Sequence, residues 1–256
     1  GWGGFWFWDP VENVSLMPWL ALTTLLHCIL VLEKKSILTS WVIILSIATF
    51  TLSMCGTFLV RSGILNSVHT FANDPSRGIY ILLFLSFMVF GSVIILLKKI
   101  KRRNYTINSN SKETFILINN WFMIFYLATV FIGTVYPIFT EVLSDHKISV
   151  GPPFYNKVII PVLVIFLFFM SVGPKARWIK NKFNDLKIIL MILFGSILMN
   201  VFIVYFFKSY SVLSNLIIIS SFFLIISSTI DVLNSLKINN FNFSRVISHI
   251  SFGFLI

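Results

Sequence analysis

The sequence predicts an all-α membrane protein, a polytopic transmembrane helical bundle with about eight spans. Of its 256 residues, 57% are hydrophobic and only 11% are charged, whereas a soluble domain contains about 25% charged residues. The mean hydropathy is +0.91. The apolar runs are long and continuous rather than alternating, which favours membrane-spanning helices.

A helix needs about 20 apolar residues to cross a bilayer, and the chain offers a series of runs near that length. We expect spans at 15–32, 41–60, 78–97, 115–140, 158–173, 188–207 and 212–230, with an eighth that begins near Val246. The chain starts without a methionine and ends inside an apolar run. We therefore expect a piece of a longer protein, truncated at both ends.

The positive charges indicate which loops lie inside. Fifteen Lys and Arg residues fall in one alternating set of loops, 33–40, 98–114, 174–187 and 231–245, and five in the other set, 1–14, 61–77, 141–157 and 208–211. The positive-inside rule places the richer set in the cytoplasm or its mitochondrial equivalent. This distribution explains the net charge of +11 without nucleic acid. We predict an external segment at 1–14, a helical bundle at 15–256, and external loops at 61–77 and 141–157.

The external segment, residues 1–14, begins "GWGGFWFWDPVEN" and is called the aromatic segment below. Its large flat side chains are Trp2, Phe5, Trp6, Phe7 and Trp8, which offer contact area at low entropy cost. Its other candidate site residues are Gly3 and Gly4, which permit close backbone approach, Pro10, which favours a turn, and the polar Asp9, Glu12 and Asn13. The combination suits a flat macrocycle such as haem. The alternative is an interfacial aromatic belt, which explains the tryptophans but not the glycines or "DPVEN".

Two of the four histidines lie within predicted spans. His27 lies five residues before the inner end of its span and His249 three residues after the inner start of its span, about 8 and 5 Å at ~1.5 Å per residue. Similar depth on two helices is what bis-histidine ligation of a haem b requires. The alternative is that each imidazole forms a hydrogen bond with a carbonyl or hydroxyl of a neighbouring helix.

The other two histidines lie in predicted external loops. His146, in "SDHKIS", has the surroundings of a solvated residue. His69, in "NSVHTFANDP", has small and apolar neighbours and faces the same compartment as the aromatic segment. Of the two, we therefore select His69 as the candidate ligand.

The aromatic segment and its continuation, "WGGFWFWDPVENVSLMPWL" at 2–20, closely resemble the tryptophan-rich WWD signature of haem-handling proteins of cytochrome c biogenesis. Further blocks narrow the resemblance to the CcmF family, the haem lyase subunits of the multi-component cytochrome c maturation system. These blocks are "LLHCILVLEKK", "GTFLVRSGILNSVHTFANDPSRG", "GTVYPIFTEVLSDHKISVGPPFYNKV" and "SVGPKARW". The likeness runs nearly end to end and is weakest from 186 to 243.

The resemblance implies an external haem site under the WWD signature. There, haem from a haem chaperone would be joined through its vinyl groups to the two thiols of C-x-x-C-H in an apocytochrome c. His69 matches the family's second external ligand of the haem iron, which makes it the candidate catalytic residue. His27 and His249 match the ligands of a structural or redox haem b in the membrane. The family's first external histidine lies upstream of the signature and is absent from this sequence.

The resemblance also implies partners and a location. Thiol-handling subunits of the maturation complex would present the apocytochrome, and quinol would be a donor of electrons to the haem b. We expect a multi-pass protein of the bacterial inner membrane, or of the mitochondrial inner membrane, with the aromatic segment and His69 facing the periplasm or its equivalent. Arg61 and Arg77 would either pair with haem propionates or, for Arg61, extend to the interface from a span end.

Four alternatives to a general cytochrome c haem lyase remain. A haem carrier or exporter would present haem without attaching it, and a paralogue would serve only a nitrite-reductase cytochrome. A respiratory cytochrome b would need two histidine pairs in the membrane, and the chain has one. A small-solute transporter would show paired intramembrane charges or broken helices, which the sequence does not suggest.

Overall fold

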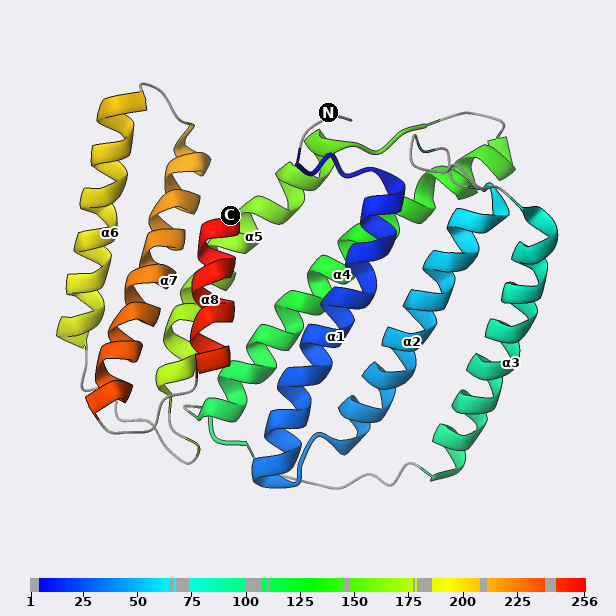
Figure 1. Ribbon diagram of the computed structural model, residues 1–256, viewed down its shortest axis with the longest axis horizontal. Coiled ribbons are helices and arrows are strands. Elements are labelled where there is room, and N and C mark those ends of the chain that lie inside the picture. Colours follow the sequence, from blue (N-terminus) through cyan, green and yellow to red (C-terminus); the bar gives the residue numbers. More distant parts are fainter. Residues whose placement is uncertain are drawn as a thin grey trace. The chain divides into compact units, whose positions relative to one another are not determined.

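The computed structural model describes residues 5–64, 67, 74–99, 107–109, 111–144, 148–176, 178, 186–207, 211–237 and 243–256 (Figure 1). Of the predicted site residues, Trp2, Gly3, Gly4 and His69 lie outside the described residues, as does His146. Within the described part, the chain is helical: α1 (Pro10–Lys35), α2 (Thr39–Ser62), α3 (Pro75–Lys99), α4 (Lys112–Ser144), α5 (Pro152–Val172), a short 3-10 helix (Gly173–Lys175), α6 (Leu186–Phe207), α7 (Val212–Lys237) and α8 (Phe243–Leu255).

The all-α membrane fold is confirmed. Seven of the described helices, α1 to α7, are long and apolar enough to cross a membrane. The eighth, α8, has 13 described residues and begins at Phe243, close to the predicted start near Val246.

Several helices begin earlier than the hydropathy predicts, because polar residues and prolines form their first turns. α1, α3 and α5 each start at a proline, Pro10, Pro75 and Pro152. Proline is favoured there, since its missing N–H would have no partner in the first turn and its φ is already helical. α4 extends the predicted span at both ends and reaches 33 residues.

The chain divides into two compact units. The first holds residues 1–106 and 120–158, and the second holds residues 107–119 and 159–256. The first therefore contains α1, α2, α3, most of α4 and the start of α5. The second contains the start of α4, the rest of α5, and α6, α7 and α8.

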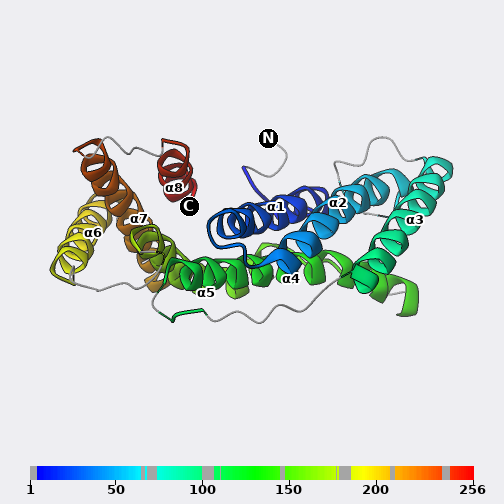
Figure 2. The ribbon, with the colours of Figure 1, turned by 90° about the horizontal axis from the view of Figure 1, so that it is seen from below.

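In the first unit, α1, α2 and α3 lie side by side in chain order (Figures 1 and 2). Gly56 allows a close approach of α2 to α1, because a Cβ there would lie 2.7 Å from Cγ1 of Val14. α1 also bonds to α4, where the amide Nδ2 of the buried Asn120 donates to Sγ of Cys28 at 3.0 Å. Polar contacts of this kind hold helices together where the surrounding lipid offers no hydrophobic driving force.

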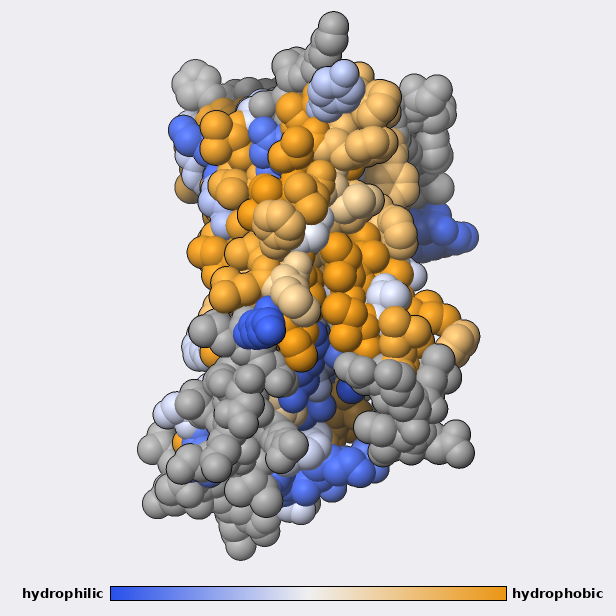
Figure 3. All heavy atoms as spheres, turned by 90° about the vertical axis from the view of Figure 1, so that its left-hand side faces the viewer, coloured by the Kyte–Doolittle hydropathy of each residue, from blue (hydrophilic) through white to orange (hydrophobic). Residues whose placement is uncertain are grey.

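In the second unit, α7 neighbours both α6 and α8. Val172, Ile192 and Phe223 form a buried apolar cluster, and a Cβ on Gly253 of α8 would lie 2.8 Å from Cγ1 of Ile225 on α7. Figure 3 shows the apolar surface on the side of α6. Its exposed side chains include Leu190, Phe194, Leu198 and Phe202, as a helix in contact with lipid would have.

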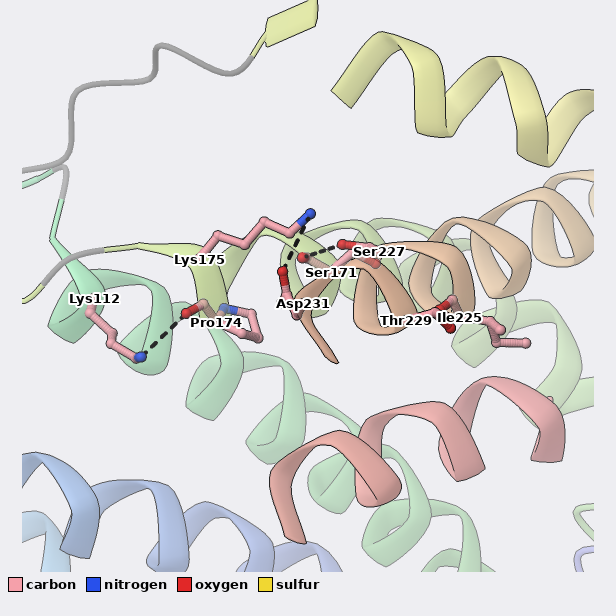
Figure 4. Close-up of polar contacts among 8 residues, drawn as sticks. All are labelled: Lys112, Ser171, Pro174, Lys175, Ile225, Ser227, Thr229 and Asp231. Atoms are coloured by element: carbon pink, nitrogen blue, oxygen red, sulfur yellow. Dashed lines mark hydrogen bonds and ion pairs between the residues drawn. The ribbon is translucent and has the colours of Figure 1, made fainter. Parts of the chain in front are cut away.

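A polar cluster joins helix ends within the second unit (Figure 4). Lys175 lies 3.8 Å from Asp231 of α7, and Nζ of Lys112 donates to the carbonyl oxygen of Pro174 at 3.3 Å. The hydroxyl of Ser227 donates to the carbonyl oxygen of Ser171 at 3.0 Å. We call Lys112, Pro174, Lys175 and Asp231 the helix-end cluster.

Candidate functional site

The aromatic segment contains the N-cap and the first turn of α1. Asp9 is the N-cap of α1, and its carboxylate accepts from the backbone N–H of Val11 at 2.9 Å. In return, Oε2 of Glu12 accepts from the N–H of Asp9 at 3.1 Å, which completes a capping box. Replacing such a cap by alanine costs about 1 kcal/mol. Pro10, which the sequence analysis expected to favour a turn, is the first residue of the helix, because Asp-Pro-x-Glu satisfies the N–H groups that a new helix leaves unpaired.

Glu12 also fixes the extended residues before the helix. Its Oε2 accepts a second bond, from the backbone N–H of Phe7 at 2.9 Å. One carboxylate therefore holds both Phe7 and Asp9, so residues 7 to 9 fold back over the first turn of α1.

Trp8, between those two residues, adopts a strained conformation. Its φ is +57°, in the left-handed region, where a bulky side chain costs roughly 1–3 kcal/mol. Two contacts hold it there. Its ring stacks on Tyr155 with centroids 4.4 Å apart and an interplanar angle of 11°, and its carbonyl oxygen accepts from Nδ2 of Asn13 at 3.1 Å.

Tyr155 and Asn13 form the buried base under the segment. Tyr155 is 0% exposed and Asn13 is 1% exposed, and Nδ2 of Asn13 donates to the Tyr155 hydroxyl at 3.0 Å. Gly133 of α4 makes room for that hydroxyl, because a Cβ there would lie 2.5 Å from it. Our sequence analysis missed Tyr155. The signal available was its place in "GPPFYN", on the same predicted side as the aromatic segment.

Other aromatic rings of the segment remain accessible. Phe5 is 82% exposed, Phe7 53% and Trp6 36%. The rings of Trp6 and Trp8 are perpendicular, with their centroids 6.1 Å apart. One face of Trp8 is covered by Tyr155, so a planar ligand would find the Trp6 side of the segment open. This arrangement offers an apolar surface on a fixed backbone.

A loop residue joins the segment from far along the chain. The hydroxyl of Ser67 donates to Oδ2 of Asp9 at 2.6 Å. The sequence analysis placed the loop 61–77 on the same side as the aromatic segment, and this bond brings the residue two positions before His69 to the N-cap of α1. Since His69 lies outside the described residues, its own position stays a prediction.

Behind the segment lies a small cavity within the first unit. Its volume is about 150 Å³, and Pro10, Asn13, Thr134 and Tyr155 are among the residues that line it. Pockets for drug-sized ligands have volumes of about 300–1,000 Å³. A macrocycle would therefore have to bind on the exposed side of the segment and not in this cavity.

The two arginines proposed for propionates have protein contacts of their own. Nε of Arg77 lies 3.1 Å from Oδ2 of Asp74, and the carbonyl oxygen of Arg61 accepts from the N–H of Asp74 at 2.8 Å. The hydroxyl of Ser76 and the backbone N–H of Arg77 both donate to Asp74, which holds the pKa of its carboxyl below the usual range. A propionate would therefore compete with Asp74 for Arg77.

His27 is arranged as a metal ligand often is. It is half-buried in α1, and its Nδ1 lies 2.8 Å from the carbonyl oxygen of Thr23. A carbonyl only accepts, so Nδ1 carries the proton and Nε2 keeps a lone pair with which it could bind a metal. His27 therefore fits a haem ligand.

His249 lies half-buried on α8, in the second unit, whereas His27 lies in the first. Both residues fall within helices, as the sequence predicted. From the helix ends Lys35 and Phe243, their depths are about 12 and 9 Å at ~1.5 Å per residue. That they share one haem stays a prediction.

Comparison with known proteins gives the same family as the sequence blocks. A family model described as "Cytochrome C assembly protein" matches residues 1–65. The chain is 45% identical over 179 residues to the cytochrome c-type biogenesis protein CcmF of Pseudomonas fluorescens. It is 48% identical over 180 residues to the cytochrome c-type biogenesis protein CycK of Bradyrhizobium diazoefficiens. Each alignment covers 70% of this chain and 27% of the relative, so the chain spans just over a quarter of the length of these relatives.

A solved structure of the cytochrome c heme lyase CcmF has the same fold. The TM-score is 0.74 at 23% sequence identity, over 99% of this chain and 39% of that one. The curated relatives carry the resemblance, and the solved structure supports the arrangement of the helices. The predicted resemblance to the CcmF family of cytochrome c biogenesis proteins is therefore confirmed over the aligned residues, which make up 70% of this chain.

Proposed function

We propose that this protein acts in cytochrome c biogenesis as part of a haem lyase. In this proposal the aromatic segment and His69 hold haem on the outer side of the membrane, and the haem is attached there to the C-x-x-C-H motif of an apocytochrome c. The names of the similar proteins, "Cytochrome c-type biogenesis protein CcmF" and "Cytochrome c Heme Lyase CcmF", support this proposal.

The observation that carries the proposal is the bond between Ser67 and Asp9. It ties the chain just before His69 to the segment whose exposed rings are Phe5, Trp6 and Phe7. An iron ligand on one element and an aromatic wall on another are the parts that a haem site needs. The bond supports their meeting on one side of the protein.

The attachment reaction requires no covalent bond between haem and this protein. The S–H of each cysteine adds across a haem vinyl group, so that sulfur bonds to one vinyl carbon and hydrogen to the other, with no atom lost and no net oxidation. The substrate supplies its own nucleophile. The protein's contribution is to hold ring and peptide in reacting geometry and to exclude water.

Asp9, Glu12 and Asn13 act in this proposal by shaping the segment. Each engages the backbone of residues 7 to 11 or the base beneath it. They place the aromatic rings. Trp6 is the ring we assign to haem stacking, and Trp8 the ring that anchors the segment.

A second haem, of b type, is proposed in the membrane with His27 and His249 as ligands. When bound, it would supply one-electron transfer that keeps the substrate iron ferrous, with quinol as the source of electrons. The support is the protonated Nδ1 of His27, which leaves Nε2 for iron, and the sequence depth of both residues. In purified full-length protein, His27→Ala should remove the b-haem absorbance, and unchanged haem content would contradict the assignment.

The partners and the location follow from the same family resemblance. We propose that a haem chaperone, apocytochrome c and thiol-handling subunits meet this protein at the periplasmic side of a bacterial inner membrane. The excess of Lys and Arg in the opposite loops supports this orientation.

The decisive test compares the two loop histidines. His69→Ala should abolish covalent haem in a co-expressed cytochrome c, measured by haem staining of denatured protein, while the membrane haem stays. His146→Ala is the matched control and should mature cytochrome c normally. Normal maturation by His69→Ala would refute a role for His69 at the external site.

A further inference from the structure

We infer that Tyr155 is a positioning residue, which holds the aromatic segment in its haem-binding conformation through Trp8 and Asn13. The inference rests on the proposed function for the identity of the ligand. The positioning itself rests on contacts within the first unit alone.

The segment has a point of strain that needs an external support. Trp8 takes a φ of +57°, and an isolated chain would relax from that conformation. The neighbouring bonds of Glu12 fix the N–H groups of Phe7 and Asp9, on either side of Trp8. They do not fix the indole ring, whose direction is set by the parallel stack on Tyr155.

Tyr155 is itself rigidly held. It is fully buried, and α4 lies against its hydroxyl, since a Cβ on Gly133 would lie 2.5 Å from it. Tyr155 therefore transmits the position of α4 to the segment. A side chain so placed can select one orientation of Trp8, and through it the orientation of Trp6.

Asn13 links Trp8 to Tyr155. Its Nδ2 donates both to the Trp8 carbonyl and to the Tyr155 hydroxyl. The Trp8 carbonyl can only accept, so the amide nitrogen must face it. Oδ1 of Asn13 is buried without a hydrogen-bond partner among the described residues. Asn13 is thus fixed through its nitrogen alone, and loss of Tyr155 removes one of those two bonds together with the stack.

The cavity beside this base gives the segment room to move when the support is lost. Its lining includes Asn13 and Tyr155, which form the base, and Pro10, which lies in the first turn of α1. A truncated side chain at position 155 would enlarge it. The segment would then sample several conformations, of which only some present Trp6 to a planar ligand.

The test uses three variants of the full-length protein. Tyr155→Leu removes the stack and the hydroxyl, Tyr155→Phe keeps the ring, and Tyr80→Leu is the same substitution at an exposed tyrosine of α3. Hydrogen exchange of Phe7 and Asp9 is measured without added haem, because both amides are bonded only while the segment is folded back. We expect at least a tenfold acceleration for Tyr155→Leu, less than threefold for Tyr155→Phe, and wild-type rates for Tyr80→Leu.

A second measurement, the retention of external haem, tests whether the position of the aromatic segment affects haem binding. Tyr155→Leu should lower retention of external haem at least tenfold and alter its absorption spectrum, whereas Tyr155→Phe should restore most of both. If Tyr155→Leu fails to fold, Gly133→Ala gives the same test with Tyr155 in place, since the new Cβ would displace its hydroxyl.

Three results would overturn the inference. They are wild-type exchange in Tyr155→Leu, equal effects of leucine and phenylalanine, and unchanged haem retention despite a loosened segment. If the wild-type protein retains no external haem, the proposed function fails instead, and the exchange rates still decide whether Tyr155 sets the segment.

Discussion

The aromatic segment and the helix-end cluster both hold helix ends in place, but they differ in what they leave exposed. The helix-end cluster uses charged groups that satisfy one another: Lys175 pairs with Asp231, and Lys112 bonds to Pro174 while lying 5.5 Å from the ring centre of Trp178. The aromatic segment uses an aromatic stack, the Asn13 amide and two carboxylates that accept from backbone N–H groups, and it leaves rings exposed. The difference indicates that the cluster is structural, whereas the segment retains surface for a ligand.

The largest expected effect separates two tryptophans of the segment. Trp8→Ala should destabilise the protein by about 3 kcal/mol, the low end for loss of a large packed ring, because Trp8 is only partly buried. Trp6→Ala should change stability by less than about 1 kcal/mol, as its ring is more exposed. Yet both variants should lose external haem. Unfolding in mixed micelles and haem retention would be measured on each, and normal haem retention by Trp6→Ala would refute stacking on that ring.

The cap of α1 should give an intermediate effect. Asp9→Ala removes the bonds to Val11 and Ser67 and should cost about 1–2 kcal/mol, whereas Asp9→Asn keeps a capping oxygen and should cost less. Cytochrome c maturation should fall in the same order. If Asp9→Asn matured cytochrome c as poorly as Asp9→Ala at equal protein level, the carboxylate charge and not the cap would be what matters.

Substitutions in the helix-end cluster should reduce cytochrome c maturation less than substitutions in the aromatic segment do. Asp231→Asn should cost about 1 kcal/mol, since the Lys175 pair is long and partly exposed. Maturation per molecule of folded protein should remain near wild type. A complete loss of maturation with normal folding would erase the contrast between the two regions.

The smallest effect concerns pH and the start of α3. The pKa of Asp74 is lower in the folded protein, mainly through the Ser76 hydroxyl and the Arg77 backbone N–H. Its contribution to stability is therefore complete above the unfolded pKa near ~4 and is lost as the pH falls through the lower folded value. The protection factor of the Arg77 amide, the exchange rate of an unprotected amide divided by its own rate at the same pH, should fall below that range in the wild type. In Asp74→Asn the protection factor should show no such pH dependence.

The helical fold could be predicted because hydropathy and loop charge depend on composition, which a single sequence displays. The helix starts at Pro10, Pro75 and Pro152 could have been predicted as well, since proline after a capping residue is a local signal. Hydropathy windows overlooked them because first turns are polar.

The base of the segment could not be predicted from the sequence. Asn13 and Tyr155 are separated by 142 positions, and no periodicity or spacing within one sequence pairs residues at that distance. The same holds for Ser67 and Asp9, 58 positions apart. The candidate site was thus located by its tryptophans, while the contacts that shape it required the structure.

The most direct test of haem attachment is reconstitution with purified components. The full-length protein would be given haem, a reductant and an apocytochrome c that bears C-x-x-C-H, and the product would be extracted with acidified acetone. We predict haem that stays with the cytochrome after extraction and has the pyridine haemochrome spectrum of a thioether-linked haem. Haem that binds the protein but is fully extracted from the cytochrome would contradict the account and indicate a carrier.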